Sequence, residues 1–288
     1  MSGARFQDLA PGSPVLVDEV NSTGPNRSGE QPTVSLGGSV DLPLLGLGTW
    51  QMRGSECYRA VRHALDVGYR HIDTATMYRN ERDVGRAVGD SGLARNEVVI
   101  TTKLPPDRVG RERKTLGASL DALGTEYVDL WLIHWPPSGR AGVSTWREFI
   151  RLRDEGKVRA IGVSNYGLDQ LDELFRASGV MPQVNQIPWG PSHYDPVEVE
   201  GLRARQVVLE GYSPFRSTDL RHPVLVEIAT DHGVTPAQVV LRWHVDHRFV
   251  AIPKSARPER IETNFDVFHF SLTDEELRRI DGLSSRRR

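Results

Sequence analysis

The sequence has 288 residues but only one cysteine, Cys57, which excludes a disulfide framework and a zinc site built on thiolates. So few thiols are typical of the reducing cytoplasm, and we expect a cytoplasmic protein. No run approaches the roughly 18 apolar residues of a membrane span, and the N-terminus lacks the apolar core of a signal peptide. The formal net charge of −2 gives no general attraction to nucleic acid or membrane, so neither partner is predicted.

Apolar residues are also scarce at the start of the chain. Residues 1–32 are rich in Gly, Ser, Pro, Asn and charge. Such a segment buries too little surface to offset its ordering entropy, so we predict a disordered N-terminal tail. Residues 33–288 form one folded domain in this interpretation, and we expect it to be a monomer.

From residue 33, short apolar segments alternate with amphipathic helical patterns. A β-hairpin is predicted first, with segments 33–36 and 40–45 joined by a glycine turn. The predicted strands are 45–48, 71–74, 98–103, 128–134, 160–164, 184–186, 207–212 and 250–253. The predicted helices are 56–66, 82–91, 111–123, 145–155, 168–177, 197–205, 224–232, 237–244 and 273–280, and Thr273 caps the last one with Glu276.

Eight strands that alternate with helices over roughly 250 residues indicate an α/β fold, a (β/α)8 TIM barrel whose floor is closed by the N-terminal hairpin. A doubly wound sheet is the alternative. The dinucleotide pattern G-x-G-x-x-G of that fold is missing, because the segment Gly46-Leu47-Gly48-Thr49-Trp50 lacks the third glycine and does not continue into a helix. The barrel is therefore favoured.

Polar residues end seven of the predicted strands, where a barrel places its active site. They are Asp73, Lys103, His134, Ser164-Asn165, Gln186, Tyr212-Ser213 and Lys254-Ser255. One such residue has an ordinary explanation, such as a cap or a strand-end ion pair. Seven that converge on one mouth indicate a binding site.

Asp73, Tyr78, Lys103 and His134 suit proton transfer to an oxygen that gains negative charge. A tyrosine is a poor acid at neutral pH, with an ordinary pKa near ~10. A nearby ammonium lowers that pKa, and a carboxylate holds the ammonium in place. An imidazole beside the phenol can orient a carbonyl oxygen. Taken singly, Asp73 could cap a loop, Lys103 could only pair with it, and His134 could be a core histidine.

The order and spacing of these residues resemble those of the aldo-keto reductases, in particular bacterial members similar to 2,5-diketo-D-gluconate reductase. The resemblance spans residues 33–282. Its motifs are Gly68-Tyr69-Arg70-His71-Ile72-Asp73-Thr74-Ala75, Tyr78 with Asn80-Glu81, Thr102-Lys103-Leu104, Asp129-Leu130-Trp131-Leu132-Ile133-His134-Trp135-Pro136, Gly156-Lys157-Val158-Arg159-Ala160-Ile161-Gly162-Val163-Ser164-Asn165, Val184-Asn185-Gln186, Tyr212-Ser213-Pro214 and Ile252-Pro253-Lys254-Ser255.

The resemblance implies an NADPH-dependent reduction of aldehydes or ketones, with Tyr78 as proton donor, Lys103 and Asp73 as its tuning pair and His134 as carbonyl orienter. It assigns the nicotinamide carboxamide to Ser164, Asn165 and Gln186, and the stacked nicotinamide ring to Tyr212. The other implied cofactor positions are Ser213, Phe215, Lys254, Ser255, Arg260 and Asn264. The implied substrate-pocket residues are Trp50, Trp135 and Trp189. The cation, hydroxyl and guanidinium of Lys254, Ser255 and Arg260, in one loop and helix start, match a grip on the 2′-phosphate, which favours NADPH over NADH.

Three departures from the family pattern concern the rim and the cofactor. The loop 187–193 replaces the usual acidic and aromatic residues and brings Trp189, which we expect to make the pocket rim more apolar. Thr263 stands where a glutamate is common, so the adenine contact of that glutamate is in doubt. Phe215-Arg216 replaces a Leu-Gly pair near the expected pyrophosphate.

Two other functions compete with the reductase. A non-catalytic NADPH-binding regulatory subunit would share the cofactor site, but all four catalytic-type residues are present. A barrel hydrolase would need a second carboxylate beside Asp73, and no other strand ends in one. No His, Asp or Glu cluster suggests a metal site.

Overall fold

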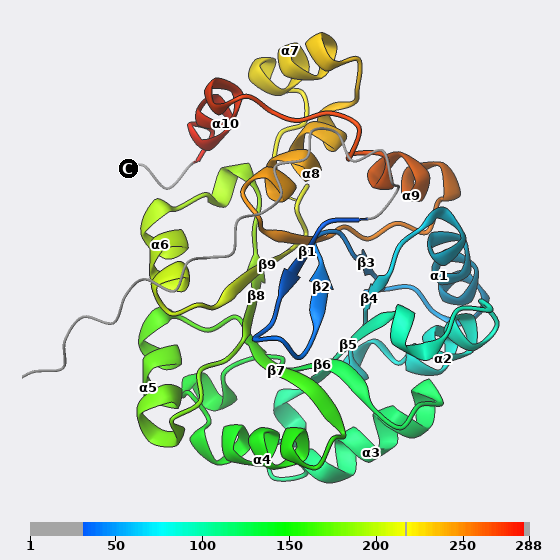
Figure 1. Cartoon of the computed structure of the whole chain (residues 1–288), viewed down its shortest axis with the longest axis vertical. Coiled ribbons are helices and arrows are strands. Elements are labelled where there is room, and N and C mark those ends of the chain that lie inside the picture. The colour runs from blue at the N-terminus through cyan, green and yellow to red at the C-terminus, as the bar shows by residue number, and fades with distance from the viewer. Residues whose placement is uncertain (1–30, 217, 285–288) are drawn as a thin grey trace, which may run out of the picture.

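The computed structural model describes residues 31–216 and 218–284, so most of the predicted tail and the last four residues lie outside it. Within this part of the chain, eight parallel strands form one sheet in which each strand pairs with its neighbours in chain order (Figure 1). The strands are β3 (Leu47–Gly48), β4 (His71–Asp73), β5 (Val99–Leu104), β6 (Val128–Ile133), β7 (Val158–Ser164), β8 (Val184–Pro188), β9 (Val208–Tyr212) and β10 (Val250–Ile252). The predicted (β/α)8 barrel is confirmed.

Parallel bridges between the first and last strands close the barrel. Leu45 pairs with Ala251 and Gly48 with Lys254. Only glycine fits at position 48, because a Cβ there would lie 2.8 Å from the backbone oxygen of Ile252. The missing side chain thus lets the two strands meet.

Helices surround the sheet and alternate with its strands in the described residues (Figure 1). They are α1 (Gly54–Val67), α2 (Glu81–Gly89), α3 (Glu112–Leu123), α4 (Val143–Asp154), α5 (Leu168–Ser178), α6 (Pro196–Ala204), α7 (Pro223–His232), α8 (Pro236–Asp246), α9 (Pro258–Phe265) and α10 (Asp274–Asp281). The predicted helices are confirmed to within a few residues, including the capping box of Thr273 and Glu276. Sequence periodicity missed α9 except for its start, because its eight residues have no side-chain N-cap, whereas the equally short α10 has a capping box. None of the described helices combines the length and the apolar composition that a bilayer crossing requires.

The hairpin β1 (Thr33–Ser35) and β2 (Asp41–Pro43) is antiparallel and lies across the centre of the barrel in Figure 1. Its apolar side chains share a buried cluster with residues of the barrel interior: Leu36, Val40, Leu42 and Leu44 from the hairpin segment, and Leu130, Leu132, Ala160, Val184 and Val250 from the strands. The end of the barrel where the strands begin is therefore filled with apolar side chains, and any site must lie at the opposite end.

Candidate active site

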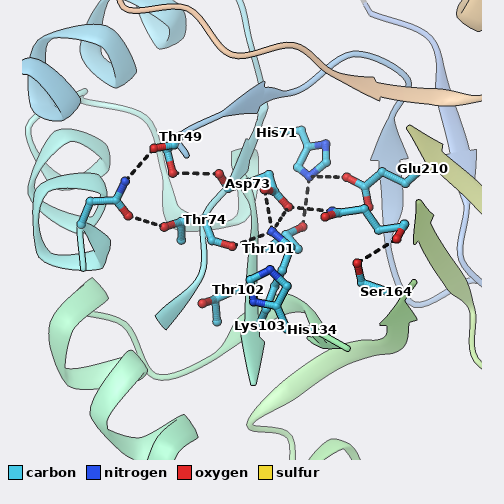
Figure 2. Close-up of polar contacts among 12 residues, drawn as sticks. Thr49, His71, Asp73, Thr74, Thr101, Thr102, Lys103, His134, Ser164 and Glu210 are labelled. Carbon is cyan, nitrogen blue, oxygen red and sulfur yellow. Dashed lines mark hydrogen bonds and ion pairs between the residues drawn. The ribbon is translucent and has the colours of Figure 1, made fainter. Parts of the chain in front are cut away.

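An ion pair between Asp73 and Lys103 lies at the centre of the site (Figure 2). The Lys103 Nζ donates to the two Asp73 carboxylate oxygens at 2.6 and 2.7 Å, and to the Thr74 backbone oxygen at 2.9 Å. Both side chains are buried. Burial alone would lower the pKa of Lys103, but the charges of Asp73 and Tyr78 and the hydrogen bonds of Asp73 raise it above its ordinary value. Lys103 is therefore a cation at neutral pH.

A short 3-10 turn, η1 (Thr76–Tyr78), carries Tyr78 to this ion pair. Thr76 Oγ1 donates to the Lys103 backbone oxygen at 3.0 Å, which fixes the turn against β5. Asn80 fixes the other end, because its Oδ1 accepts from Thr74 Oγ1 at 2.6 Å and its Nδ2 donates to the Thr49 backbone oxygen at 2.9 Å. The loop that follows β4 thus holds the phenol in one place.

Tyr78 faces both Lys103 and His134. The Lys103 Nζ lies 5.1 Å from the centre of the phenol ring, and the His134 ring meets it edge-on at 5.8 Å. Burial raises the pKa of Tyr78, while the charge and hydrogen bond of Lys103 lower it. The expected effect of the lysine is present, but the net pKa is raised because burial disfavours the phenolate more strongly. Tyr78 keeps its proton through neutral pH.

His134 is buried and stacks on Trp135 at 4.1 Å. Burial, and then the charge of Lys103, lowers the pKa of His134 to about 2. The imidazole is therefore neutral and can offer one N–H as a hydrogen-bond donor.

A second set of polar groups comes from the ends of β7, β8 and β9. Asn165 Nδ2 donates to Ser164 Oγ at 3.0 Å and to the His134 backbone oxygen at 3.1 Å, and Asn165 Oδ1 accepts from Tyr212 Oη at 2.9 Å. Gln186 Nε2 donates to Asp73 Oδ2 at 2.8 Å, so this amide joins the two halves of the site. Asn165 adopts a left-handed backbone conformation, φ +65°, which directs its amide over the barrel mouth.

These groups surround a cavity of about 220 Å³. Its lining residues are Gly48, Trp50, Asp73, Tyr78, His134, Trp135, Ser164, Asn165, Gln186, Tyr212, Ser213, Arg216, Ile252 and Lys254. Lys103 lies beneath the cavity floor. The structure therefore brings together the four predicted catalytic residues, two of the predicted pocket tryptophans and most of the predicted cofactor residues.

Three predicted cofactor residues lie outside the cavity, beyond Lys254. Ser255 is buried and accepts from the Arg257 backbone N–H at 3.1 Å, while Arg260 is exposed on α9 and Asn264 is buried farther along that helix. All three follow Lys254, a cavity residue, within ten positions along the chain. Thr263, the departure from the family pattern, donates to the Glu259 backbone oxygen at 2.7 Å within α9.

Trp189 was wrongly predicted to line the substrate pocket. Its side chain is 1% exposed and packs edge-on against Phe249 at 5.8 Å, with Tyr194 at 6.3 Å. The chain turns after Pro188 and directs the indole behind the sheet, where it joins the aromatic cluster beside α8. Burial of so large an aromatic surface explains this position better than exposure at a rim.

Phe215 does not line the cavity either. It is half-buried and packs against the main core, whereas the next residue, Arg216, faces the cavity. Sequence reasoning noted Arg216 but gave it no place in the site. Its charge near the predicted cofactor residues was the available signal.

Sequence reasoning also missed Glu210, a second carboxyl group in the barrel interior. It is fully buried on β9, two residues before Tyr212. The inward-outward alternation of β9 could have revealed it, because Glu210 and Tyr212 share a face. Glu210 does not line the cavity, so it is not the second carboxylate that a hydrolase would need. Among the described residues, no three His, Cys, Asp or Glu side chains form a candidate metal site.

Comparison with known proteins gives the same family over nearly the whole chain. The pattern of the aldo/keto reductase family matches residues 44–285. The chain is 45% identical over 263 residues to 9,11-endoperoxide prostaglandin H2 reductase of Trypanosoma cruzi, covering 88% of this chain and 92% of that protein. It is 40% identical over 262 residues to methylglyoxal reductase DkgA of Yersinia pestis, covering 90% and 95%. The crystal structure of a Bombyx mori aldo-keto reductase in complex with NADP is 31% identical, with a TM-score of 0.84 and coverage of 90% and 94%.

Proposed function

The chain belongs to the aldo/keto reductase family, and we propose that Tyr78 delivers the proton when a bound aldehyde or ketone is reduced. The protein is an NADPH-dependent oxidoreductase that reduces carbonyl compounds to alcohols. One observation carries the proposal for Tyr78: its phenol, the neutral His134 and the Lys103–Asp73 ion pair meet at one cavity.

The residues around the cavity fit the nicotinamide end of the cofactor. An amide needs paired donors and acceptors, which Ser164, Asn165 and Gln186 offer, and a flat ring needs an aromatic face, which the half-buried Tyr212 offers. When NADPH is bound, its nicotinamide supplies the hydride. Gln186 also donates to Asp73, so we infer that this hydrogen bond links the binding of the carboxamide to the position of the Asp73–Lys103 ion pair.

Cations lie where the phosphates of this cofactor would run. Lys254 and Arg216 line the outer part of the cavity, and Arg260 is exposed on α9 beyond them. Guanidinium groups bind phosphate through two parallel hydrogen bonds, so Arg260 suits the 2′-phosphate that distinguishes NADPH from NADH. Ser255 and Asn264 are buried on the segment that follows β10 and on α9, respectively.

Three residues divide the proton chemistry. His134 stays neutral because burial lowers its pKa to about 2, so its N–H can hold the substrate oxygen without delivering a charge. Tyr78 gives its proton to that oxygen as negative charge develops there. Lys103, fixed by Asp73, stabilises the phenolate that Tyr78 becomes. After the product alcohol leaves, Tyr78 regains a proton from solvent through the open mouth.

The rim favours small carbonyl compounds with an apolar substituent. Trp50 and Trp135 line the cavity, and they are 48% and 41% exposed. The cavity of about 220 Å³ is smaller than the roughly 300–1,000 Å³ of sites for drug-sized ligands. Both the nicotinamide and the reacting carbonyl must share this space, so larger substrates would extend past the tryptophans into solvent.

The test is a screen of carbonyl compounds in which NADPH consumption is followed by absorbance. We expect turnover of a reactive aldehyde such as 4-nitrobenzaldehyde. NADPH binding without turnover of any aldehyde or ketone would instead support the non-catalytic regulatory subunit, for which the reductases named above offer no support.

We also infer that the protein is a cytoplasmic monomer that binds no nucleic acid. The single cysteine, which is buried, supports the cytoplasmic location. The net charge near zero gives no attraction to nucleic acid. Light scattering after gel filtration would measure the monomer mass of 32.2 kDa, and a dimer mass would contradict the inference.

A further inference from the structure

Directly beneath the site lies a second titratable pair, Glu210 and His71. Glu210 precedes Tyr212 by two residues on β9, and His71 precedes Asp73 by two residues on β4, so each points into the barrel one layer deeper than its partner at the mouth. Both are fully buried, and Figure 2 shows them facing each other. In barrels of this type such a layer is usually filled by branched apolar residues, so two ionisable groups there need an explanation.

The contacts of this pair would stabilise a negative charge on Glu210 only weakly. His71 Nε2 lies 3.0 Å from Thr101 Oγ1 and 3.7 Å from Glu210 Oε1. His71 fills the space left by Gly46, where a Cβ would lie 2.5 Å from its Nδ1. Within residues 31–216 and 218–284, neither carboxyl oxygen of Glu210 meets the geometry of a hydrogen bond, because the nearby Gln186 amide donates to Asp73 instead and only weakly lowers the pKa of Glu210. An ionised carboxylate without such partners costs several kcal/mol.

Glu210 is nevertheless connected to the catalytic ion pair. Its register partners on the neighbouring strands are Gln186 and Val250, neither of which titrates. Gln186 donates to Asp73 Oδ2 at 2.8 Å, which places one amide between the two carboxyl groups. The titratable groups that face Glu210 are thus His71 and Asp73 from β4 and Lys103 from β5.

The charges of these groups balance only if Glu210 holds a proton. Asp73 already occupies the one cation, Lys103, through two short hydrogen bonds. His71 offers no second cation, because burial, and then the charge of Lys103, lowers its pKa to about 3. Burial, and then the charge of Asp73, raises the pKa of Glu210 to about 8.

We propose that Glu210 is a positioning residue for the proton chemistry: it stays protonated at neutral pH, and its ionisation at alkaline pH holds Tyr78 in the phenol form through Asp73 and Lys103. A new negative charge near Lys103 raises the pKa of the ammonium, and it also raises the pKa of the phenol. Reduction needs the phenol, whereas the reverse reaction, oxidation of an alcohol, needs the phenolate as base. Glu210 would therefore suppress alcohol oxidation as the pH rises. This inference rests on the proposed role of Tyr78.

The test compares the wild-type protein with Glu210→Gln, which has the shape of the protonated acid but cannot ionise. The measurement is kcat/KM for oxidation of 4-nitrobenzyl alcohol with NADP+ from about pH 6 to about pH 10. We expect the alkaline rise of the variant to begin about one pH unit lower than that of the wild type. Reduction of 4-nitrobenzaldehyde at pH 7 should stay within about twofold. Superimposable oxidation profiles would overturn the proposal.

Thr101→Val is the matched control, since it removes the hydrogen-bond partner of His71 without changing the number of carboxyl groups. Its oxidation profile should follow that of the wild type. A shift equal to that of Glu210→Gln would mean that disturbed packing, and not ionisation, moves the profile, which would also overturn the proposal.

An infrared titration of the wild-type protein separates this inference from the proposed function. We expect a carboxylic acid band at pH 7 that fades above about pH 8 and is missing from Glu210→Gln. Absence of that band in the wild type would overturn the proposal even if Glu210→Gln does not fold. A protein that shows the band but turns over no carbonyl compound would contradict the role of Tyr78, while protonation of Glu210 would stand.

Discussion

Replacement of Asp73 by Asn tests whether the buried ion pair holds the site together. The change keeps the shape of the side chain but leaves the Lys103 ammonium without its hydrogen-bonded carboxylate at a position that solvent does not reach. Both short hydrogen bonds, at 2.6 and 2.7 Å, lose their ionic partner. Loss of one member of a buried ion pair costs about 3–5 kcal/mol, so we expect the free energy of unfolding to fall by that amount at pH 7.

The sign of the pH dependence follows from Lys103. Without Asp73, burial lowers the pKa of Lys103 below its unfolded value of about 10.4. The unfolded state then binds more protons than the folded state, so the stability of Asp73→Asn rises with pH and its deficit shrinks between about pH 7 and pH 10. Neutral Lys103 no longer favours the phenolate of Tyr78. The pKa of Tyr78 then rises further, which makes the phenol a weaker general acid, and we expect kcat for reduction to fall by about tenfold or more.

Urea unfolding at about pH 7 and about pH 10 measures how much free energy of unfolding Asp73→Asn loses relative to the wild type. Asp66→Asn is the matched control. Asp66 pairs with Arg62 at 3.2 Å but is 58% exposed, so its replacement should cost less than about 1 kcal/mol at either pH. Equal effects of the two substitutions, or a deficit for Asp73→Asn that grows with pH, would refute this account of the ion pair.

Three further predictions concern the cofactor, His134 and the core. Arg260→Ala should raise the Michaelis constant for NADPH far more than that for NADH, and equal effects in steady-state kinetics would remove its assignment to the 2′-phosphate. The pKa of His134 is lowered to about 2, so its titration should not affect kcat for reduction near pH 6.5. The pH–rate profiles of the wild type and of His134→Gln check this: a break near pH 6.5 that is present in the wild type and missing from the variant would contradict it. Trp189→Ala should cost about 3–5 kcal/mol of stability with little change in the KM for aldehydes, and a large change in KM at unchanged stability would return Trp189 to the pocket.

Much of the fold could be predicted because the pattern repeats. Each strand–helix unit carries the same alternation of a short apolar run and an amphipathic segment, and the glycine turn of the hairpin is a strong local signal. The exception is α9, which has no side-chain N-cap, whereas the equally short α10 is indicated by the capping box of Thr273 and Glu276. The closure of the barrel through Gly48 depends on a contact between the first and last strands, which no local pattern contains.

Within the site, residues at strand ends were predictable, because the fold fixes where those ends lie. Residues placed by tertiary packing were not. Trp189 follows a strand end directly, yet the aromatic cluster beside α8 draws it behind the sheet. Glu210 lies in an otherwise apolar strand, and only the folded structure shows that it is close to His71 and Asp73. The net rise in the pKa of Tyr78 likewise depends on its burial, which the order of residues does not give.

The most direct test of the central claim is Tyr78→Phe, which removes one oxygen from the cavity and leaves its walls unchanged. Binding of NADPH, followed by quenching of tryptophan fluorescence, should stay within about threefold of the wild type. Reduction of 4-nitrobenzaldehyde should fall by 10²-fold to 10⁴-fold or more, the range expected for loss of a general acid. Turnover close to the wild-type rate, with cofactor binding intact, would contradict the claim that Tyr78 delivers the proton.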